Sequence, residues 1–417
     1  MLTRSGGSAD ALESSAPVSD SRPRALFLSA ESPYPAIGGG PLRSASLLEF
    51  LTQRYEVDVA LFTEQHASDP RDSFPAGRVR RISLIELPQH SRAPLARRWR
   101  MASRIIRNRP PLIDRFAGFE REIASSIAEK QYDIAFVEHI WCAPYIKQIR
   151  PRARRVLLDA HNIESVWHDR VARSSGFAQR AAFKQFARAC RKFERAWLPQ
   201  YDAVLVPSEN DAQHLAGSRA IIYPNAIPSV PRPAREERQE IVFTGNLEYE
   251  PNISAVRYFH ERIWPAVRQR VPDLVWRIAG KNPNAISFVN GDDRIRVTGP
   301  MGNAVSVLAE AKVAIAPLLS GSGTRFKIVE AWAAGTPVVS TRLGAEGLNC
   351  NPGEHILICD EPGEFAEAVA FLIDAPEARL QLGDAGRRLY ESSYTWDVAW
   401  TALERQLTSI GVDLTRT

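Results

Sequence analysis

Short runs of aliphatic residues alternate with longer stretches of apolar residues at helical spacing along this 417-residue chain. Such runs are typical of strands buried in parallel sheets, and the stretches between them are typical of covering helices. We expect strands at 24–28, 57–62, 82–87, 134–138, 156–159, 203–207, 241–244, 274–279, 295–298, 313–316, 337–340 and 355–358. We expect helices at 41–54, 119–129, 178–197, 252–269, 305–309, 324–334, 364–374, 377–391 and 397–410. This alternation predicts α/β domains built on parallel sheets.

A proline-rich and charged stretch at 224–238 divides the chain into two halves of similar architecture. Such a composition is typical of a linker. We therefore predict a disordered lead-in at 1–22, a first domain at 23–222, a linker at 223–239, a second domain at 240–394 and a C-terminal helical segment at 395–417. The expected fold class is α/β, with two Rossmann-like domains that face each other across a cleft. In open sheets of this kind, ligands bind at the carboxyl ends of the strands.

Composition narrows the class of protein. The four cysteines, Cys142, Cys190, Cys350 and Cys359, form neither a C-x-x-C pair nor a zinc spacing, which fits a reducing cytosol. No apolar run approaches the length of a transmembrane helix, and the N-terminus lacks the apolar core of a signal peptide. We therefore expect a cytoplasmic protein. Its net charge is +5, with the excess of Lys and Arg in the first half, which either faces an anionic partner or has solvated helices.

The most informative segment leads from the strand at 313–316 through a glycine turn into the helix at 324–334. The turn consists of Gly321, Ser322, Gly323 and Thr324. Free N–H groups at a helix start attract anions, and the cations Arg325 and Lys327 suit a diphosphate better than a neutral ligand. Glu330 lies further along the helix, where a carboxylate accepts hydrogen bonds from sugar hydroxyls. This order of groups predicts a nucleotide-sugar site, although a Gly-Ser-Gly turn before a helix often binds nothing.

Glycine loops also follow the first strand of each half. The first consists of Gly38, Gly39 and Gly40, with Arg43 in the helix that follows. These glycines would let a ligand approach closely, but Arg43 breaks a G-x-G-x-x-G fingerprint, and the chain has no P-loop sequence. In the second half, Gly245 and Asn246 would offer backbone N–H groups to a phosphate. An ordinary loop between a strand and a helix is the alternative for both segments.

His161 follows the strand at 156–159 and should therefore lie in the cleft. An imidazole there can hydrogen-bond a reacting hydroxyl or a sugar, with Asp159 and Asn162 as polar neighbours. A structural histidine is the alternative. A metal site made of His161, Glu164 and His168 is disfavoured because the H-E-x-x-H spacing is missing.

A basic amphipathic stretch lies between the strands at 82–87 and 134–138. Its arginines are Arg92, Arg97, Arg98, Arg100, Arg104, Arg107, Arg109 and Arg115, and Trp99, Met101, Ile105 and Ile106 lie between them. A helix of this composition can rest on an anionic membrane surface, and a solvated helix face is the alternative. No recognition fold for nucleic acid is apparent, so we expect no nucleic acid as a partner.

With these residues in view, the chain resembles the family-4 (group 1) retaining glycosyltransferases of the GT-B fold over residues 24–410. The matching motifs lie at 38–40, 159–162, 201–209, 223–225, 243–245, 278–280 and 323–347. The resemblance implies transfer of a hexose from a nucleotide sugar to an acceptor hydroxyl, with retention at the anomeric carbon and with no metal or other cofactor. It implies that Glu330 binds the ribose and that His161 lies near the reacting sugar on the acceptor side. It also implies that the last helix crosses back onto the first domain.

The chain departs from the family pattern at two places. Ser322 stands where a glutamate usually lies eight residues before the ribose-binding one, and Asn246 stands where an arginine is common. The phosphate cations must then come from elsewhere, and Arg325 and Lys327 are favoured, with Lys281 third. We expect catalytic roles for His161, Arg325 and Lys327, and donor-binding roles for Gly245, Asn246, Lys281, 321–324 and Glu330. The segment from Gly38 to Gly40, together with Arg43, is expected to approach the diphosphate or the acceptor.

The predicted function is glycosyl transfer in polysaccharide or glycolipid assembly. The acceptor would be a glycan, a lipid-linked glycan or a small molecule. The basic first half favours an anionic acceptor, such as a lipid-linked pyrophosphate glycan at the inner membrane face. Two alternatives stay open. One is a nucleotide-sugar epimerase or hydrolase of the same fold, and the other is a non-catalytic module that binds nucleotide sugars.

Overall fold

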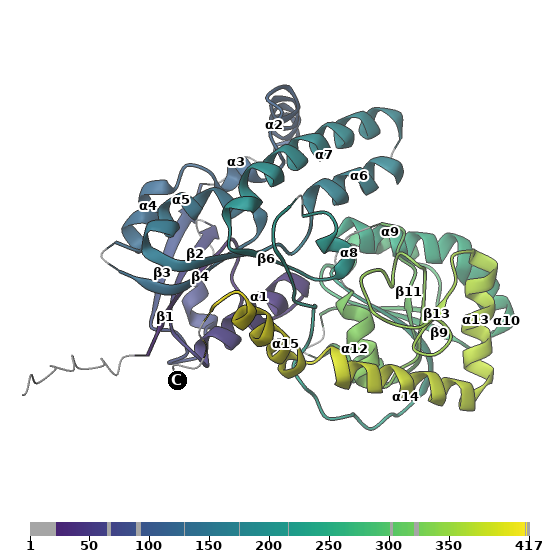
Figure 1. The fold of residues 1–417 in the computed structure, drawn as a ribbon. Helices are drawn as coiled ribbons and strands as arrows, with labels where there is room; N and C mark the ends of the chain where they lie inside the picture. The colour runs from purple at the N-terminus through teal and green to yellow at the C-terminus, as the bar shows by residue number, and fades with distance from the viewer. Residues whose placement is uncertain are drawn as a thin grey trace, which may run out of the picture.

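The structure is a computed structural model that describes residues 22–64, 68–88, 93–128, 130–174, 176–215, 217–300, 303–320, 325–412 and 414. Figure 1 shows two lobes side by side, one formed by the first half of the chain and one by the second. Each lobe holds a parallel sheet with helices around it, which confirms the predicted fold class. The predicted lead-in lies outside the described residues except for Arg22. No helix in the described ranges is long and apolar enough to cross a membrane.

The first sheet has the strand order β3-β2-β1-β4-β5-β6-β7, and all neighbouring strands are parallel. Its strands are β1 (Arg24–Ser29), β2 (Glu56–Glu64), β3 (Arg81–Leu87), β4 (Tyr132–Glu138), β5 (Ala153–Asp159), β6 (Ala203–Val206) and β7 (Ala220–Ile222). Ala25 of β1 pairs with Val57 on one side and with Ile134 on the other. The order reverses at β1, so the carboxyl ends of β1 and β4 mark the place where such sheets bind ligands.

Helices cover both faces of this sheet. They are α1 (Gly39–Thr52), α2 (Pro94–Ile106), α3 (Ile113–Phe116), α4 (Glu120–Ser126), α5 (Ile146–Ile149), α6 (Glu164–Ser174), α7 (Phe177–Trp197) and α8 (Glu209–Ala212), with short 3-10 turns η1 (Pro70–Ser73), η2 (Ile140–Tyr145), η3 (Arg150–Arg152) and η4 (Leu198–Gln200). Alternate residues of β1 enter different cores, Leu26 and Leu28 on one face and Phe27 on the other. The strands read as aliphatic runs because both faces are buried.

The second sheet has the order β10-β9-β8-β11-β12-β13 and is also parallel. Its strands are β8 (Arg238–Thr244), β9 (Val275–Ala279), β10 (Ile295–Thr298), β11 (Ala311–Ala316), β12 (Val338–Ser340) and β13 (Leu357–Ile358). Its helices are α9 (Glu250–Tyr258), the π-helical η5 (Phe259–Ile263), α10 (Trp264–Arg270), the 3-10 turn η6 (Pro283–Val289), α11 (Ala304–Ala309), α12 (Phe326–Ala334), α13 (Pro362–Asp374) and α14 (Pro376–Ser393). The order reverses between β8 and β11, which places a second ligand-binding edge there.

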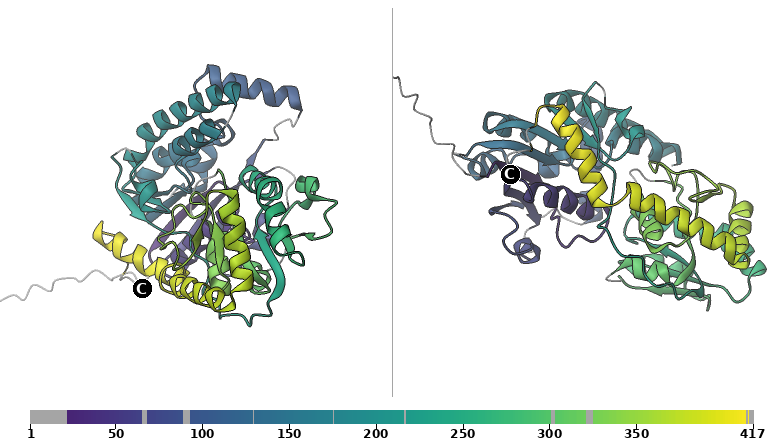
Figure 2. Two further views of the ribbon diagram at one scale, coloured as in Figure 1. Left: turned by 90° about the vertical axis from the view of Figure 1, so that its right-hand side faces the viewer. Right: turned by 60° about the horizontal axis from the view of Figure 1, so that its bottom comes forward.

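The last helix, α15 (Trp396–Ser409), returns to the first domain, as the resemblance implied (Figure 2). Leu403 is buried in the first domain's core, and the indole of Trp400 donates to the carbonyl of Ser46 at 3.0 Å. The two segments of the chain that connect the domains, one around Ile227 and one around 394–396, are hydrogen-bonded to each other. The N–H of Ile227 donates to the carbonyl of Tyr394 at 3.1 Å, and the carbonyl of Ile227 accepts from the N–H of Trp396 at 3.0 Å.

Some elements differ from the sequence expectation. The helix expected at 252–269 is interrupted by η5, because Pro265 has no N–H to continue the regular ladder. Helix α6 was not predicted at all. Its buried positions include Ser165, His168 and Ala172, which carry no apolar periodicity.

Candidate functional site

The carboxyl ends of β1, β4 and β5 bring together the polar side chains of the first domain. Glu138 ends β4 and Asp159 ends β5, and both are fully buried. His161 places Nε2 3.1 Å from Oε2 of Glu138 and 3.4 Å from Oδ2 of Asp159. The ring of His139 lies 3.8 Å from that of His161, measured between centroids. Glu31, just beyond β1, completes the cluster, with Oε1 3.4 Å from Nε2 of His139.

The surroundings of His161 favour its charged form. Burial alone would lower the pKa of an imidazole, but the carboxylates of Glu138 and Asp159 outweigh burial and raise the pKa of His161 to about 9. The pKa of His139 is instead lowered, because burial and the neighbouring charge of His161 disfavour a second imidazolium. At neutral pH His161 is therefore a cation that can donate a hydrogen bond but does not take up a proton.

His139 is a residue of this cluster that the sequence analysis missed. Its φ of +64° lies in the left-handed region, which residues other than glycine seldom adopt and which is enriched at functional sites. Its ring stacks on Trp141, with centroids 4.5 Å apart and planes inclined by 5°. The available signal was the end of the predicted strand at 134–138, which places Glu138 and His139 at the same edge as Asp159.

Arg43 does not approach a phosphate or an acceptor, contrary to the sequence prediction. It is the fifth residue of α1 and lies on the buried side of the helix, where its side chain is 1% exposed. Nε and Nη2 donate to both carboxylate oxygens of Asp159 at 2.6–3.0 Å. Nη1 donates to the carbonyl of Tyr223 at 2.6 Å and to Oδ1 of Asn225 at 2.9 Å. Arg43 therefore fixes Asp159, and with it His161, to the segment that leads into the second domain.

The three glycines lie where the two domains meet. Gly38 is the N-cap of α1 with φ +95°, and Gly39 and Gly40 form the first turn. A Cβ on Gly40 would collide with the carboxylate of Glu31, and a Cβ on Gly39 would lie 3.1 Å from the ring of Phe326 at the start of α12. The start of α1 thus approaches both the histidine cluster and the helix that was predicted to bind the donor.

Donor-binding residues predicted in the second domain gather at the ends of β8 and β9 and at the start of α12. A Cβ on Gly245 would lie 3.2 Å from Nζ of Lys327, and a Cβ on Gly280 would collide with the carbonyl of Gly245. The two loops are therefore in contact. Lys327 donates from Nζ to Oδ1 of Asn252 at 2.9 Å. Lys281, the third candidate cation, follows Gly280 and is exposed.

The other predicted donor residues fall into two groups. The side chain of Asn246 accepts a hydrogen bond from the N–H of Glu248 at 3.0 Å, so it shapes its own turn. The glycine turn lies outside the described residues, and the predictions for its members stay predictions. These members are Gly321, Ser322, Gly323 and Thr324.

The charged residues of the α12 segment are placed where burial penalises their charges. Arg325 is 7% exposed, and burial lowers its pKa. Burial, with the neighbouring charge of Arg325, lowers the pKa of Lys327 well below 10.5. Burial raises the pKa of Glu330 to about 7, although Lys327 opposes this shift. A diphosphate beside the two cations would offset the cost of burying them.

Contacts across the cleft come from α6, which the sequence analysis did not foresee. Arg170 of α6 forms a bidentate ion pair with Glu346 of the second domain. Nη1 lies 2.5 Å from Oε2, and Nη2 lies 2.7 Å from Oε1. Trp167, also on α6, hydrogen-bonds Tyr249 in the loop after β8. These contacts hold the first domain against the donor-side loops.

Some groups of the first domain could act as metal ligands. Two sets in the described part of the chain bring three potential ligand atoms within 4.8 Å of one another: Glu31, His139 and His161, and Glu138, Asp159 and His161. In the second set Asp159 already binds Arg43, so a metal would compete with a buried ion pair. His161, Glu164 and His168 form no such set among the described residues.

Comparison with known proteins places the second domain in a family. Residues 238–375 match the family described as glycosyl transferases group 1. The chain is also 22% identical over 360 residues to an uncharacterized 44.6 kDa protein in the cps region of Klebsiella pneumoniae, covering 82% of this chain and 89% of that protein.

Solved structures share the fold of the whole chain. Sucrose-phosphate synthase from Thermosynechococcus elongatus superposes with a TM-score of 0.70 at 17% identity, over 93% of this chain and 100% of the other. HepE from Anabaena, in complex with UDP-glucose, superposes with a TM-score of 0.61 at 14% identity, over 93% and 99%. The fold is therefore that of the GT-B glycosyltransferases. Together, the family match of the second domain and the fold of the chain support a group 1 glycosyltransferase, as the sequence motifs indicated.

Proposed function

We propose that this glycosyltransferase moves a hexose from a nucleotide sugar to an acceptor hydroxyl in polysaccharide or glycolipid assembly, with retention at the anomeric carbon and without a metal. The observation that carries the proposal is the close approach of Gly39 to Phe326, whose ring lies 3.1 Å from where a Cβ on Gly39 would be. It brings the α12 segment, with Arg325 and Lys327, next to the cluster around His161. In this proposal, Arg325 and Lys327 bind the diphosphate, and His161 donates a hydrogen bond to a sugar in the same cleft.

In the proposed reaction, the bond between the anomeric carbon and the β-phosphate oxygen breaks, and negative charge grows on that phosphate. Arg325 and Lys327 stabilise this charge in a cleft sheltered from water, where charges interact more strongly than in solution. The acceptor hydroxyl attacks from the same face, and its proton passes to the leaving phosphate. His161, held as a cation by Glu138 and Asp159, donates a hydrogen bond that orients a sugar hydroxyl.

Product analysis tests this proposal. UDP-, GDP- and ADP-hexoses are incubated with glycan and alkyl glycoside acceptors, with and without EDTA, and the anomeric configuration is read by NMR. We expect a retained product formed at the same rate with EDTA. An inverted product would contradict retention, and activity lost with EDTA but restored by a divalent ion would contradict a metal-free reaction. Donor consumption without an acceptor would favour an epimerase or hydrolase, and donor binding without turnover would favour a binding module.

Glu330→Ala should weaken nucleotide binding about ten- to a hundredfold, because a hydrogen bond to a charged group contributes about 1.5–3 kcal/mol. Calorimetric titration with UDP, GDP and ADP measures the loss, and UDP is tried first because HepE was solved with UDP-glucose. Glu377→Ala, an exposed carboxylate on α14, is the matched control. Unchanged affinity in Glu330→Ala would refute the ribose assignment.

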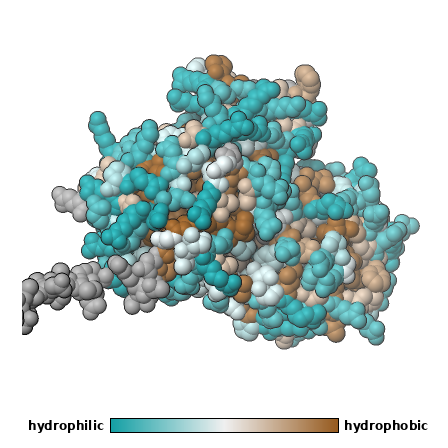
Figure 3. Space-filling model, in the orientation of Figure 1, coloured by the Kyte–Doolittle hydropathy of each residue, from teal (hydrophilic) through white to brown (hydrophobic). Residues whose placement is uncertain are grey.

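We also propose that the protein binds the anionic surface of the inner membrane face and that α2 makes the contact with the lipids. Leu95, Trp99 and Ile106 are 78%, 74% and 82% exposed and recur at helical spacing, and we call them the α2 stripe. In Figure 3 apolar atoms project at the top of the molecule, where Figure 1 places α2. Arg107 and Arg109 are exposed next to this stripe. Apolar side chains flanked by arginines suit a bilayer with anionic headgroups. Arg92 lies outside the described residues.

Trp99→Ser combined with Ile106→Ser should weaken binding to vesicles of phosphatidylserine and phosphatidylcholine at least about tenfold, because burial of each apolar side chain contributes about 1.5–3 kcal/mol. Vesicle sedimentation measures this binding. Phe371→Ser on α13, 53% exposed and in the other domain, is the control. Binding should also weaken with added salt. Equal binding of both variants, or binding insensitive to salt and to anionic lipid, would contradict membrane attachment through α2.

A further inference from the structure

A cavity is lined by residues of α2, α6 and α7 of the first domain and by Tyr249 of the second domain. It has a volume of about 350 Å³, within the range of pockets that bind small molecules. Its lining includes Met101 of α2, Leu112, Trp141, Trp167 of α6, and Phe183 and Phe186 of α7. The surface that it offers is therefore mainly aromatic and aliphatic.

Burial disfavours the charged forms of the ionisable groups in this lining. Burial lowers the pKa of His168 to about 4, so its imidazole is neutral. The His168 ring lies 5.8 and 5.6 Å from the rings of Phe183 and Phe186. Burial, with the charge of Glu194, raises the pKa of Glu164 to about 7. The cavity thus prefers an apolar occupant to a charged one, because an unpaired charge loses its hydration there.

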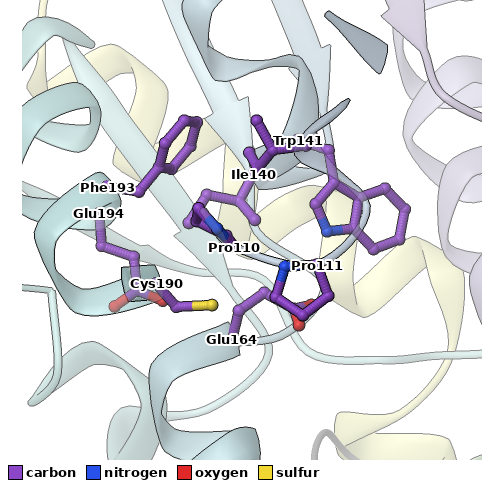
Figure 4. A pocket seen from close by; sticks show the side chains of 9 residues that line it. Pro110, Pro111, Ile140, Trp141, Glu164, Cys190, Phe193 and Glu194 are labelled. Atoms are coloured by element: carbon purple, nitrogen blue, oxygen red, sulfur yellow. The ribbon is translucent and has the colours of Figure 1, made fainter. Parts of the chain in front are cut away.

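A much smaller cavity, of about 10 Å³, lies next to this one and shares part of its lining. Figure 4 shows this smaller cavity with Glu194 and Cys190 on the left, Trp141 on the right and Glu164 below. Pro111, Trp141 and Glu164 line both cavities. Since the smaller one has room for roughly a single water molecule, only the larger one can accept part of a substrate.

The cavity connects two places that the proposed function uses. Its lining includes Asn162, the residue after His161, and Tyr249 of the second domain, so it borders the region where the two domains meet. Its lining also includes Met101 and Leu112, which are 45% and 37% exposed. Met101 belongs to α2, the helix that carries the α2 stripe on its exposed side.

We propose that this cavity binds the apolar chain of a lipid-linked acceptor, whose hydroxyl-bearing end then lies beside His161. This inference rests on the proposed function and adds the group by which the acceptor is held. A hydrocarbon chain that moves from a bilayer into this cavity passes from one apolar environment to another, so its binding does not require exposure of the chain to water. A sugar ring would leave most of its hydroxyls without a hydrogen-bond partner in the same lining.

Soluble alkyl phosphates test the inference. Butyl, octyl and dodecyl phosphate, each kept below the concentration at which it forms micelles, are titrated calorimetrically into the full chain. We expect Kd to fall about fourfold for each methylene that enters the cavity, the equivalent of about 0.8 kcal/mol. An affinity that is independent of chain length would overturn the inference, as would competition by methyl hexosides for the octyl phosphate site.

Variants locate the binding. Phe183→Ala removes part of the lining, and Met101→Trp fills the cavity from a half-exposed position, so at least one of the two should fold. Both should abolish the dependence on chain length. Phe177→Ala, on the same helix as Phe183 but 92% exposed and not in the lining, should keep it. Unchanged binding in both cavity variants would overturn the inference.

UDP titration of the same samples separates this inference from the function on which it rests. UDP binding without any alkyl phosphate binding would overturn the lipid site alone and leave the transferase proposal standing. Alkyl phosphate binding without binding of any nucleotide would instead contradict the proposed function.

Discussion

Replacement of Arg325 by alanine is expected to lower kcat about a hundred- to a thousandfold and to change donor affinity far less, because removal of one oriented donor from a developing anion has an effect of this size. Arg325 is the N-cap residue of α12 and is 7% exposed. Solvent therefore cannot replace its charge when the β-phosphate departs. Release of nucleoside diphosphate at saturating donor gives kcat, and calorimetry gives the affinity.

A matched control for this experiment lies in the same domain. The side chain of Arg342 is 80% exposed, and Arg342→Ala should leave kcat unchanged. If Arg325→Ala lowers donor affinity as much as it lowers kcat/KM, the residue acts in ground-state binding, and its role in the transition state is wrong.

Arg43→Met should lower the free energy of unfolding by about 3–5 kcal/mol, the usual effect of removing one partner of a buried ion pair. The carboxylate of Asp159 would stay fully buried beside His161 but without the guanidinium, and Tyr223 and Asn225 would each lose a hydrogen-bond donor. Urea unfolding followed by circular dichroism measures the change.

A partly exposed ion pair is the control for Arg43. Arg54 lies 3.3 Å from Glu404 of α15, with side chains 17% and 43% exposed, and Arg54→Met should cost less than about 1 kcal/mol. Equal stability of Arg43→Met and the unmodified chain would contradict the structural role of Arg43. A double variant, Arg43→Met with Asp159→Leu, should recover part of the loss because no buried charge is left unpaired.

Most of the fold could be predicted because its strands are buried on both faces. The run at 313–316 is aliphatic throughout and the run at 24–28 is apolar after Arg24, so their type is not ambiguous. The three-residue β7 is too short to carry such a pattern. Helix α6 has small and polar residues on its buried side, and only the tertiary contacts of that side reveal it.

The two sides of the candidate site differ in how far the sequence could predict them. Gly245 follows a strand, and Lys327 and Glu330 lie one turn apart on a helix, so local patterns suffice to predict a donor side. The first-domain side depends on segments far apart in the chain. Arg43 lies 116 positions from its partner Asp159, and no local sequence pattern indicates that its side chain points into the core of the domain.

The two segments that connect the domains affect how the domains can move against each other. Because Ile227 hydrogen-bonds to both Tyr394 and Trp396, the two segments form one narrow strip and not two independent tethers. Bending about the strip keeps both hydrogen bonds, whereas sliding or twisting would break them. Of the possible movements between the two domains, bending about this strip is therefore the one that costs no hydrogen bond between the connecting segments.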